Sequence, residues 1–455
     1  MKEDIPTYDL AVRGGFILNP GDDPGIIPES LVLVKNGIID FAGPLIKAPA
    51  YKADKIISAN GKYVMPPFFN QHTHLSPSLY RGLGTDLHLH DWLNQVIWPL
   101  EKKYCNPDNV YLGTVLSLIE SIKSGTGTLA NMDFHNASAG KALSQAGIRG
   151  LLGEGLFDEA TPSSNRPDDT FLYTEQLIKD YKDNDLISLY LAPHAPFSCS
   201  PVLYEKTGEL ARKWNIPVGT HLCETIVEVD NIKSKYGLSP VELLDRTGVF
   251  DHHLVAYHGI HIDEKDIEIL YRKDVSVVHN PHSNMALGSG ICRVPELLSR
   301  GIRVGLGTDS ASSNNHLSML RELQTAYLIH KGVNRDPALL PARTVLHMAG
   351  AAGYEIYRME DLGRLAEGFK ADLMIMDLNS SHNLPVIDPF GSIVSSSHSN
   401  DVISLMVNGR MIMEDRKLLT LDEDLYLKEA RIFGDRVKQD FPKMFKSGMK
   451  ETGYE

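Results

Sequence analysis

Short apolar segments alternate with amphipathic segments through the middle of the chain. Eight runs of strand type each end in polar or histidine residues, and the segments between them have the apolar spacing of helices. Leu112, Val115 and Ile119, for example, recur at intervals that place them on one helical face. The runs are 63–70, 126–133, 148–156, 186–192, 216–221, 253–258, 275–279 and 302–309. Eight strand–helix units predict an α/β fold, the (β/α)₈ barrel of TIM type.

An open, doubly wound parallel sheet is the alternative fold for such a pattern. That fold normally carries a glycine-rich, phosphate-binding turn after an early strand. The sequence has no such turn, so the closed barrel is the better prediction.

Both ends of the chain are rich in segments of β type. Residues 8–18 and 31–41 have the pattern of strands, and so do residues 372–377 and 402–413. The dipeptide Asn408-Gly409 is typical of a hairpin turn. Two β-rich pieces at opposite ends of a chain can pair into one small domain.

This pattern predicts two domains. We expect residues 1–65 and 357–455 to form a composite β-sandwich with a C-terminal helical tail. Residues 66–356 would form the barrel, which we expect to be the catalytic domain.

Charge and cysteine content narrow the class of ligand and the compartment. The 455 residues carry a net charge of −13 and contain no run rich in Lys or Arg, which argues against nucleic acid and for a small ligand. The four cysteines are far apart and form no C-x-x-C pair, as expected in a reducing compartment. No signal-peptide core and no apolar run of about 18 residues is present, so we expect a cytoplasmic protein that does not enter a membrane.

Metal-binding side chains follow several of the predicted strands. His72 and His74 end the first run, His221 ends the fifth, and Asp309 ends the eighth. The C-terminal ends of barrel strands meet at one face, and alternate residues of a strand point the same way. Three imidazoles and one carboxylate suit Zn²⁺ or Fe²⁺. The fourth strand contains no Lys to bridge two metals, so a single divalent ion is predicted, most simply Zn²⁺.

A group that moves protons is needed beside such an ion. A bound metal lowers the pKa of water so that hydroxide forms near neutral pH, and a general acid or base must then serve the leaving group. Glu224, three residues after His221, is the candidate for this proton shuttle. His258 ends the sixth run and is a candidate to assist it, whereas His279 could either line the site or be structural.

Nine stretches of the chain resemble the amidohydrolase superfamily, and nearly the whole chain fits. The likeness is greatest to the branch of methylthioadenosine/S-adenosylhomocysteine deaminases and triazine chlorohydrolases. The matching stretches are 70–74, 80–84, 91–93, 98–101, 193–196, 221–225, 279–284, 306–315 and 363–372.

The resemblance implies roles for individual residues. Asp309 would both bind the metal, together with the three histidines, and accept a proton from the attacking water. Trp92 and Glu101 occupy motif positions that contact the base and the ribose in nucleoside deaminases of this branch. His194, at the fourth strand, would also face the nucleoside. The branch further implies a homo-oligomer, either a dimer or a tetramer.

The third strand departs from the pattern of the homocysteine-binding members. Those members commonly place an Arg there and a second Arg in the following loop, because Arg pairs with a carboxylate in bidentate fashion. Glu154 occupies the first position, where it would repel a carboxylate, and Arg166 is the candidate for the second. A neutral or cationic substrate is therefore expected, and S-adenosylhomocysteine is not favoured.

The function predicted from the sequence is hydrolytic deamination of an amino-substituted heterocycle. Methylthioadenosine, adenosine and related nucleosides are the first candidates. Alternatives are a pterin or guanine as substrate, or removal of chloride or an alkylamine from a triazine ring. A metal-free scaffold protein is disfavoured because every ligand and the acid are present.

Overall fold

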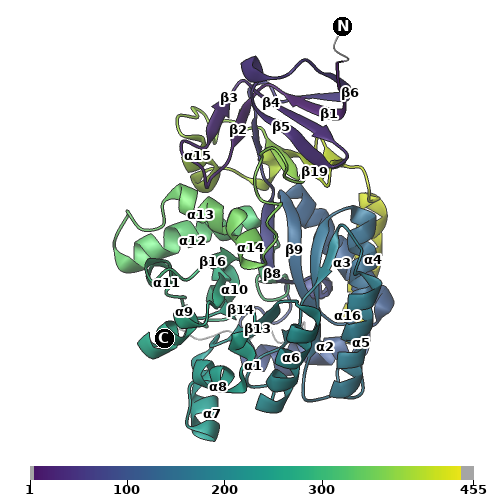
Figure 1. The fold of residues 1–455 in the computed structure, drawn as a ribbon. Helices are drawn as coiled ribbons and strands as arrows, with labels where there is room; N and C mark the ends of the chain where they lie inside the picture. Colours follow the sequence, from purple (N-terminus) through teal and green to yellow (C-terminus); the bar gives the residue numbers. More distant parts are fainter. Residues whose placement is uncertain (1–4, 442–455) are drawn as a thin grey trace, which may run out of the picture.

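The computed structural model describes residues 5–441 (Figure 1). A barrel of parallel strands surrounded by helices forms the larger body, and a β-sandwich built from both chain ends lies at one end of it. The predicted fold class is therefore confirmed. No helix among these residues is long and apolar enough to cross a bilayer.

The barrel strands are joined in parallel around the ring. Strand β8 pairs with β9 on one side and with β17 on the other, and a bridge between Leu191 and Val218 links the two halves of the wall. The strands are β8 (Phe68–His74), β9 (Thr126–Asp133), β10 (Arg149–Leu156), β11 (Ile187–Leu189) with β12 (Ala192–Pro193), β13 (Val218–Leu222), β14 (Leu254–His258), β15 (Ser276–His279), and β16 (Val304–Leu306) with β17 (Asp309–Ser310).

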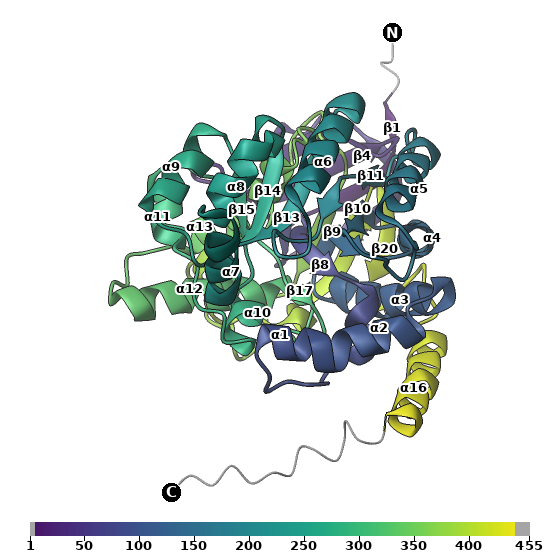
Figure 2. The same cartoon turned by 90° about the horizontal axis from the view of Figure 1, so that it is seen from below.

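Helices cover the outside of the barrel and its far end (Figure 2). Short α1 and α2, joined by the π-helical turn Leu93–Ile97, lie at the end remote from the sandwich. The helices are α1 (Leu89–Trp92), α2 (Trp98–Tyr104), α3 (Pro107–Lys123), α4 (Asn136–Ala146), α5 (Pro167–Asp180), α6 (Pro201–Trp214), α7 (Ile226–Tyr236), α8 (Pro240–Thr247), α9 (Glu264–Arg272), α10 (Pro281–Ala286), α11 (Val294–Ser299), α12 (Met319–Asn334), α13 (Ala342–Met348), α14 (Ala351–Ile356), α15 (Pro389–Ser395) and α16 (Glu423–Asp440).

The sandwich consists of two sheets. One has the strand order β5-β4-β1-β6, and the other has the order β21-β20-β19-β18-β7-β2-β3. Apolar side chains such as Val32, Val64 and Ile375 fill the space between them. The strands are β1 (Thr7–Arg13), β2 (Phe16–Leu18), β3 (Ile26–Pro28), β4 (Ser30–Lys35), β5 (Ile38–Pro44), β6 (Lys52–Ser58), β7 (Tyr63–Met65), β18 (Leu373–Met376), β19 (Val402–Val407), β20 (Arg410–Glu414) and β21 (Lys417–Leu418).

The first predicted barrel strand, residues 63–70, is wrong as a single strand. Tyr63–Met65 pairs with β18 in the sandwich, and the barrel strand begins only at Phe68. Pro66 and Pro67 lie between them, and because proline has no N–H to donate, it interrupts a ladder of backbone hydrogen bonds.

The domain limits remain a prediction. Helix α16, from the predicted helical tail, contacts the barrel: Lys123 of α3 pairs with Glu423 at 2.6 Å, and Tyr104 of α2 donates to Asp440. Residues 442–455 of that tail lie outside the described residues.

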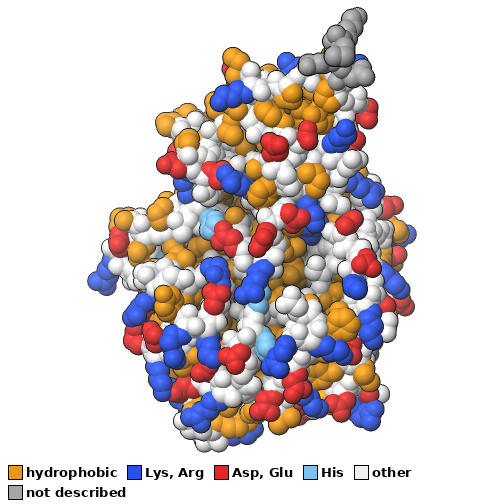
Figure 3. Space-filling model, viewed as in Figure 1, with side chains coloured by type: hydrophobic (Ala, Val, Ile, Leu, Met, Phe, Trp, Pro, Cys, Tyr) orange, Lys and Arg blue, Asp and Glu red, His pale blue; other side chains and the backbone are white. Residues whose placement is uncertain are grey.

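Acidic and basic side chains are intermixed over the face seen in Figure 3.

A buried ion pair joins the barrel to the sandwich. Arg149, at the start of β10, donates from Nε to Asp372 Oδ2 at 2.5 Å and from Nη2 to Asp372 Oδ1 at 2.9 Å. A further N–H donates to Asn408 Oδ1 at 3.0 Å. Both charged side chains are almost fully buried. Removal of one partner would leave an uncompensated charge between the two bodies.

Arg149→Ala is expected to lower the free energy of unfolding by about 3–5 kcal/mol, because it leaves Asp372 buried and unpaired. Chemical denaturation monitored by circular dichroism measures this effect. The control Arg212→Ala removes an exposed arginine on α6 and should change stability by less than about 0.5 kcal/mol. An Arg149 variant as stable as that control would contradict this account of the junction.

Candidate active site

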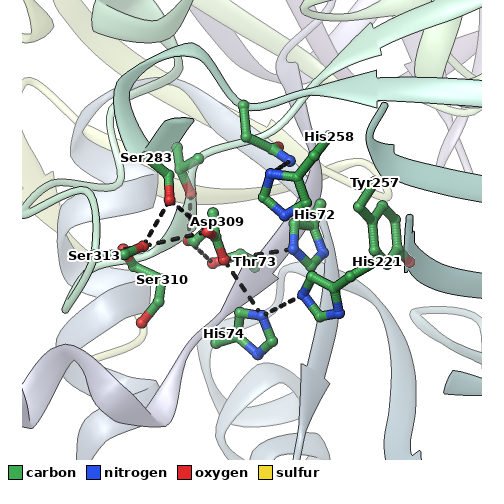
Figure 4. A network of polar contacts seen from close by, with 12 residues as sticks. His72, Thr73, His74, His221, Tyr257, His258, Ser283, Asp309, Ser310 and Ser313 are labelled. Carbon is green, nitrogen blue, oxygen red and sulfur yellow. Dashed lines mark hydrogen bonds and ion pairs between the residues drawn. The ribbon is translucent and has the colours of Figure 1, made fainter. Parts of the chain in front are cut away.

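Four side chains meet at the C-terminal face of the barrel, as the sequence predicted. His72 and His74 come from β8, His221 from β13 and Asp309 from β17. Figure 4 shows the three imidazoles turned toward one another, with Asp309 beside them. Asp309 Oδ1 lies 3.4 Å from His72 Nε2 and 3.3 Å from His74 Nε2, and the Nε2 atoms of His74 and His221 are 3.3 Å apart.

These distances fit a divalent metal ion. Ligand atoms at about 2.0–2.1 Å from a tetrahedral Zn²⁺ lie roughly 3.3–3.4 Å from one another. Four ligand atoms, one from each residue, lie within 4.8 Å of one another. His72 is fully buried, and within the described structure neither of its ring nitrogens has a hydrogen-bond partner. Such an orphaned imidazole is costly to bury unless an ion binds it.

The electrostatics of three of the four side chains favour the protonation states that bind a metal, whereas the pKa of His74 is raised because Asp309 outweighs the effect of burial there. Burial lowers the pKa of His72 to about 3 and holds that of His221 well below its usual value. Burial alone would raise the pKa of Asp309, but the imidazoles of His72 and His74 hold it well below the usual range. Neutral imidazoles and an ionised carboxylate are the forms that coordinate metals.

Hydrogen bonds from outside the cluster fix the ligand orientations. His221 Nδ1 donates to the carbonyl of His194 at 2.7 Å, which leaves Nε2 free for an ion. Asp309 Oδ2 accepts from Ser283 Oγ at 2.5 Å and from Ser313 Oγ at 3.2 Å. The second carboxylate oxygen is thereby held away from the imidazoles.

Ser283→Ala is expected to lower metal affinity or turnover by about 10- to 100-fold, because Asp309 loses its shorter hydrogen bond. Metal titration of the protein together with steady-state kinetics measures both quantities. Ser289→Ala is the matched control, since the hydroxyl of Ser289 has no partner among the described residues. Equal behaviour of the two variants would show that Ser283 does not orient the carboxylate.

Glu224 and His258 lie next to the cluster. The two side chains face each other, with His258 Nε2 3.8 Å from Glu224 Oε2. His258 Nδ1 contacts Asn284 Oδ1 at 2.7 Å, so Nδ1 carries the proton and Nε2 is left as an acceptor. Burial, with a further contribution from Asp309, raises the pKa of Glu224 to about 8. A carboxyl group with a pKa near neutrality can both give and take a proton.

Glu228 holds the backbone on which Glu224 lies, a role that was not predicted from the sequence. Its carboxylate accepts the backbone N–H of Cys223 at 2.9 Å and that of Glu224 at 3.0 Å. Thr225 caps α7 by accepting the N–H of Glu228. The Thr-x-x-Glu spacing is typical of a helix start and could have identified Glu228 as a fixed residue.

Two of the candidate residues have strained backbone. His258 has φ 72° and Asp309 has φ 59°, both in the left-handed region that residues with a side chain rarely adopt. Such strain occurs at functional sites, where the surrounding structure over-determines a conformation. His258 is the last residue of β14, and Asp309 is the first residue of β17.

A cavity lies directly above the cluster and is lined by three of the four ligands, His74, His221 and Asp309, and by Glu224. Trp92, Glu101 and His194 line the same cavity, so these predicted substrate contacts are brought together with the predicted metal ligands. Burial and then the charge of Asp133 raise the pKa of Glu101 to about 8. The remaining wall is largely aromatic and aliphatic, as expected for a site that takes a flat ring.

Arg166 is not brought to this cavity. It lies at the start of α5 with its side chain 75% exposed, and its guanidinium pairs with Asp169 at 2.7 Å. The loop before α5 places it on the surface, where it cannot hold a ligand of the cavity.

The expectation for Glu154 needs correction. The side chain is fully buried and does not line the cavity; its neighbour Gly155 does. Its carboxylate accepts the backbone N–H groups of His135 and Asn136, both at 3.0 Å, and the hydroxyl of Ser163. Burial raises the pKa of this carboxyl group to about 7, and its hydrogen bonds hold it at the N-terminus of α4, where it does not face a substrate in the cavity.

His279 takes the structural alternative. Its Nε2 lies 3.3 Å from Nε2 of buried His330, and it is not part of the cavity wall.

A second histidine pair lies near α12, where His282 Nδ1 and His316 Nε2 lie 3.2 and 3.6 Å from Glu322 Oε1. The N–H of Ser318 donates to His316 Nδ1, so the ring proton is at Nε2 and faces Glu322. Neither His282 Nδ1 nor His316 Nε2 makes a hydrogen bond among the described residues, and the three side chains could together hold an ion. Both carboxylate oxygens of Glu322 already accept hydrogen bonds, from Asn314 Nδ2 and from the backbone N–H of His282, so we expect no second metal centre here.

The family of the chain follows from comparison with known proteins. A model of the amidohydrolase family matches residues 63–412, and the chain belongs to this family. A relative from Syntrophobacter fumaroxidans named 5-methylthioadenosine/S-adenosylhomocysteine deaminase is 38% identical over 432 residues, with 94% of this chain and 98% of the relative covered. A relative of the same name from Aquifex aeolicus is 37% identical, with 95% of this chain and 98% of the relative covered.

Solved structures show the same architecture. The chain superposes with a TM-score of 0.93 on a zinc-bound adenosine deaminase from Xanthomonas campestris, at 30% identity, covering 96% of this chain and all of that one. An atrazine chlorohydrolase from Arthrobacter aurescens, also with zinc, gives a TM-score of 0.88 at 21% identity, covering 93% of this chain and all of that one. The second likeness shows the fold alone.

Proposed function

We propose that the protein is a metal-dependent hydrolytic deaminase of an adenosine-type nucleoside. The observation that carries this proposal is the position of Glu224, a buried carboxyl group with a raised pKa, beside the three-histidine and one-aspartate cluster on the wall of one cavity. Two kinds of relative support the class of substrate, the methylthioadenosine/S-adenosylhomocysteine deaminases and the adenosine deaminase.

His72, His74, His221 and Asp309 would hold the ion, which we propose to be Zn²⁺. The zinc in the similar adenosine deaminase structure and the preference of Zn²⁺ for imidazole and carboxylate ligands support this choice over Fe²⁺. When bound, the ion supplies the Lewis acidity that makes water nucleophilic near neutral pH.

Glu224 moves the protons of the reaction. As the oxygen of water adds to the ring carbon that bears the amino group, the Glu224 carboxyl group gives its proton to the adjacent ring nitrogen and takes one proton from the water. Asp309 accepts the remaining proton of the attacking water. His258 Nε2, held as an acceptor by the contact of Nδ1 with Asn284, orients the water and Glu224. The amine then takes a proton from Glu224, which Asp309 replaces with the second proton of the water, and the carbon–nitrogen bond breaks to release ammonia.

The cavity wall supplies the recognition of the nucleoside. We propose that Trp92 and His194 contact the base and that Glu101 accepts hydrogen bonds from the ribose hydroxyls. All three line the cavity that contains the metal cluster. We further propose that the enzyme acts in the cytoplasm and that it forms a dimer or a tetramer. Its substrate is a small heterocyclic compound.

A substrate panel tests this function. We expect zinc-loaded protein to release ammonia from methylthioadenosine and adenosine at rates well above those for guanine or a pterin. The second candidate, a triazine hydrolase, is kept because the same cluster could serve both reactions and the fold is shared. Release of chloride or an alkylamine from a triazine, with no ammonia from any nucleoside, would overturn the deaminase proposal.

A further inference from the structure

Two aromatic rings hold the imidazole of His194 in place on the cavity wall. The ring of Phe157 stacks on it, with the ring centroids 4.4 Å apart and an angle of 21° between the planes. The ring of Phe197 meets it edge-on, with the centroids 5.5 Å apart and an angle of 87°. Packing on two sides restricts rotation of the imidazole, so each of its nitrogens keeps its own surroundings.

The two ring nitrogens of His194 differ in what they meet. Nδ1 lies 2.7 Å from Oγ of Ser198. Within residues 5–441, Nε2 makes no hydrogen bond, but unlike the ring nitrogens of His72 it is not closed off from the cavity that His194 lines. A neutral imidazole carries one proton, so the nitrogen that bears it decides whether Nε2 donates or accepts a hydrogen bond.

The hydroxyl group of Ser198 settles where that proton lies. Two acceptors are within its reach, His194 Nδ1 at 2.7 Å and the carbonyl of Ala195 at 3.2 Å. The carbonyl of Ala195 already accepts the backbone N–H of Ser198 at 3.0 Å and that of Cys199 at 2.9 Å, which use both of its lone pairs. The hydroxyl therefore donates to Nδ1, the nearer acceptor, and the ring proton lies at Nε2.

We propose that Ser198 is a positioning residue that fixes the tautomer of His194, so that Nε2 donates a hydrogen bond to a ring nitrogen of the base. This inference rests on the proposed function. An unprotonated ring nitrogen of a purine can only accept a hydrogen bond, so the opposite tautomer would set two acceptors against each other. Ser198 does not line the cavity that contains the metal cluster, and it acts on the base only through His194.

Ser198→Ala removes the donor to Nδ1 and leaves the ring of His194 free to take either tautomer. We expect kcat/KM for adenosine to fall about fivefold, as for the loss of one hydrogen bond. The change should lie in KM, with kcat and metal content retained, because the bond serves binding of the base. Ser198→Thr keeps a hydroxyl group and should restore the wild-type value. Ser299→Ala is the matched control, because the Ser299 hydroxyl also bonds to the carbonyl three residues back, at 2.8 Å, but to no histidine.

Deaza analogues of the substrate separate this role from a general loss of structure. 3-Deazaadenosine and 7-deazaadenosine each replace one ring nitrogen of the base with a C–H group, which cannot accept a hydrogen bond. The effect of Ser198→Ala is measured on kcat/KM, or on the inhibition constant of an analogue that is not deaminated. It should vanish for one of the two analogues and persist for the other. An equal effect on adenosine and on both analogues would overturn the inference while leaving the deaminase proposal intact.

Nitrogen NMR of the imidazole gives a readout that needs no turnover. The ¹⁵N chemical shift distinguishes a protonated ring nitrogen from an unprotonated one, and His194→Gln identifies the signals of this ring. We expect Nδ1 of His194 to be unprotonated in the wild type and partly protonated in Ser198→Ala. A protonated Nδ1 in the wild type would overturn the inference. Absence of ammonia release from every nucleoside would instead overturn the proposed function.

Discussion

Glu224→Gln is expected to lower kcat for ammonia release by about 10³-fold while the protein keeps its bound metal. The amide has nearly the same shape as the carboxyl group but cannot give and take a proton. Its neighbours would hold it in place, since the backbone N–H of residue 224 still bonds to Glu228. The loss should therefore fall on the chemical step, and KM should change little.

A metal analysis and a control variant show whether the loss of activity comes from the Glu224 carboxyl group itself. Metal analysis of the Glu224→Gln protein should match the wild type, because Glu224 is not among the four ligands. Glu205→Gln, an exposed change on α6, is the matched control and should retain full activity. A Glu224→Gln protein with normal metal content and undiminished turnover would remove the basis for the proton-shuttle assignment.

Removal of the metal by a chelator is expected to abolish ammonia release, and the addition of Zn²⁺ should restore it at about one ion per chain. The chain also loses stability on chelation, since an ion that binds only the folded state stabilises it by mass action. The orphaned ring nitrogens of His72 make this loss substantial. Activity and thermal melting, followed during zinc titration, measure both effects.

The second histidine cluster provides an internal control for the metal titration. His316→Ala should leave the stoichiometry at one ion, because both carboxylate oxygens of the neighbouring Glu322 already accept hydrogen bonds. His74→Ala should reduce both metal binding and activity. Two ions per wild-type chain, with one lost in His316→Ala, would contradict the assignment of a single centre.

The ligand set could be predicted from the sequence because strand ends in a barrel have fixed positions. Once β8, β13 and β17 are recognised as parallel strands, His72, His74, His221 and Asp309 must face one another. Glu224 follows from its closeness to His221 in the chain. Each of these inferences depends on local spacing and on one regular architecture.

The roles of other residues depend on tertiary contacts, which cannot be predicted from spacing along the chain. Whether Glu154 faces the cavity or a helix depends on where the N-terminus of α4 lies, which the strand pattern does not state. The position of Arg166 depends on the path of an irregular loop. Ser283 and Asn284 act through hydrogen bonds to Asp309 and His258, which are distant in the sequence. Such roles appear only when the elements are placed in space.

The most direct test of the central claim is hydrolysis of methylthioadenosine by zinc-loaded protein in ¹⁸O-labelled water, with the products analysed by mass spectrometry. If the protein is a hydrolytic deaminase, the ring amine is replaced by one labelled oxygen and an equal amount of ammonia is released. No such product with metal-loaded protein, or a product cleaved at the ribose with its amine intact, would contradict it.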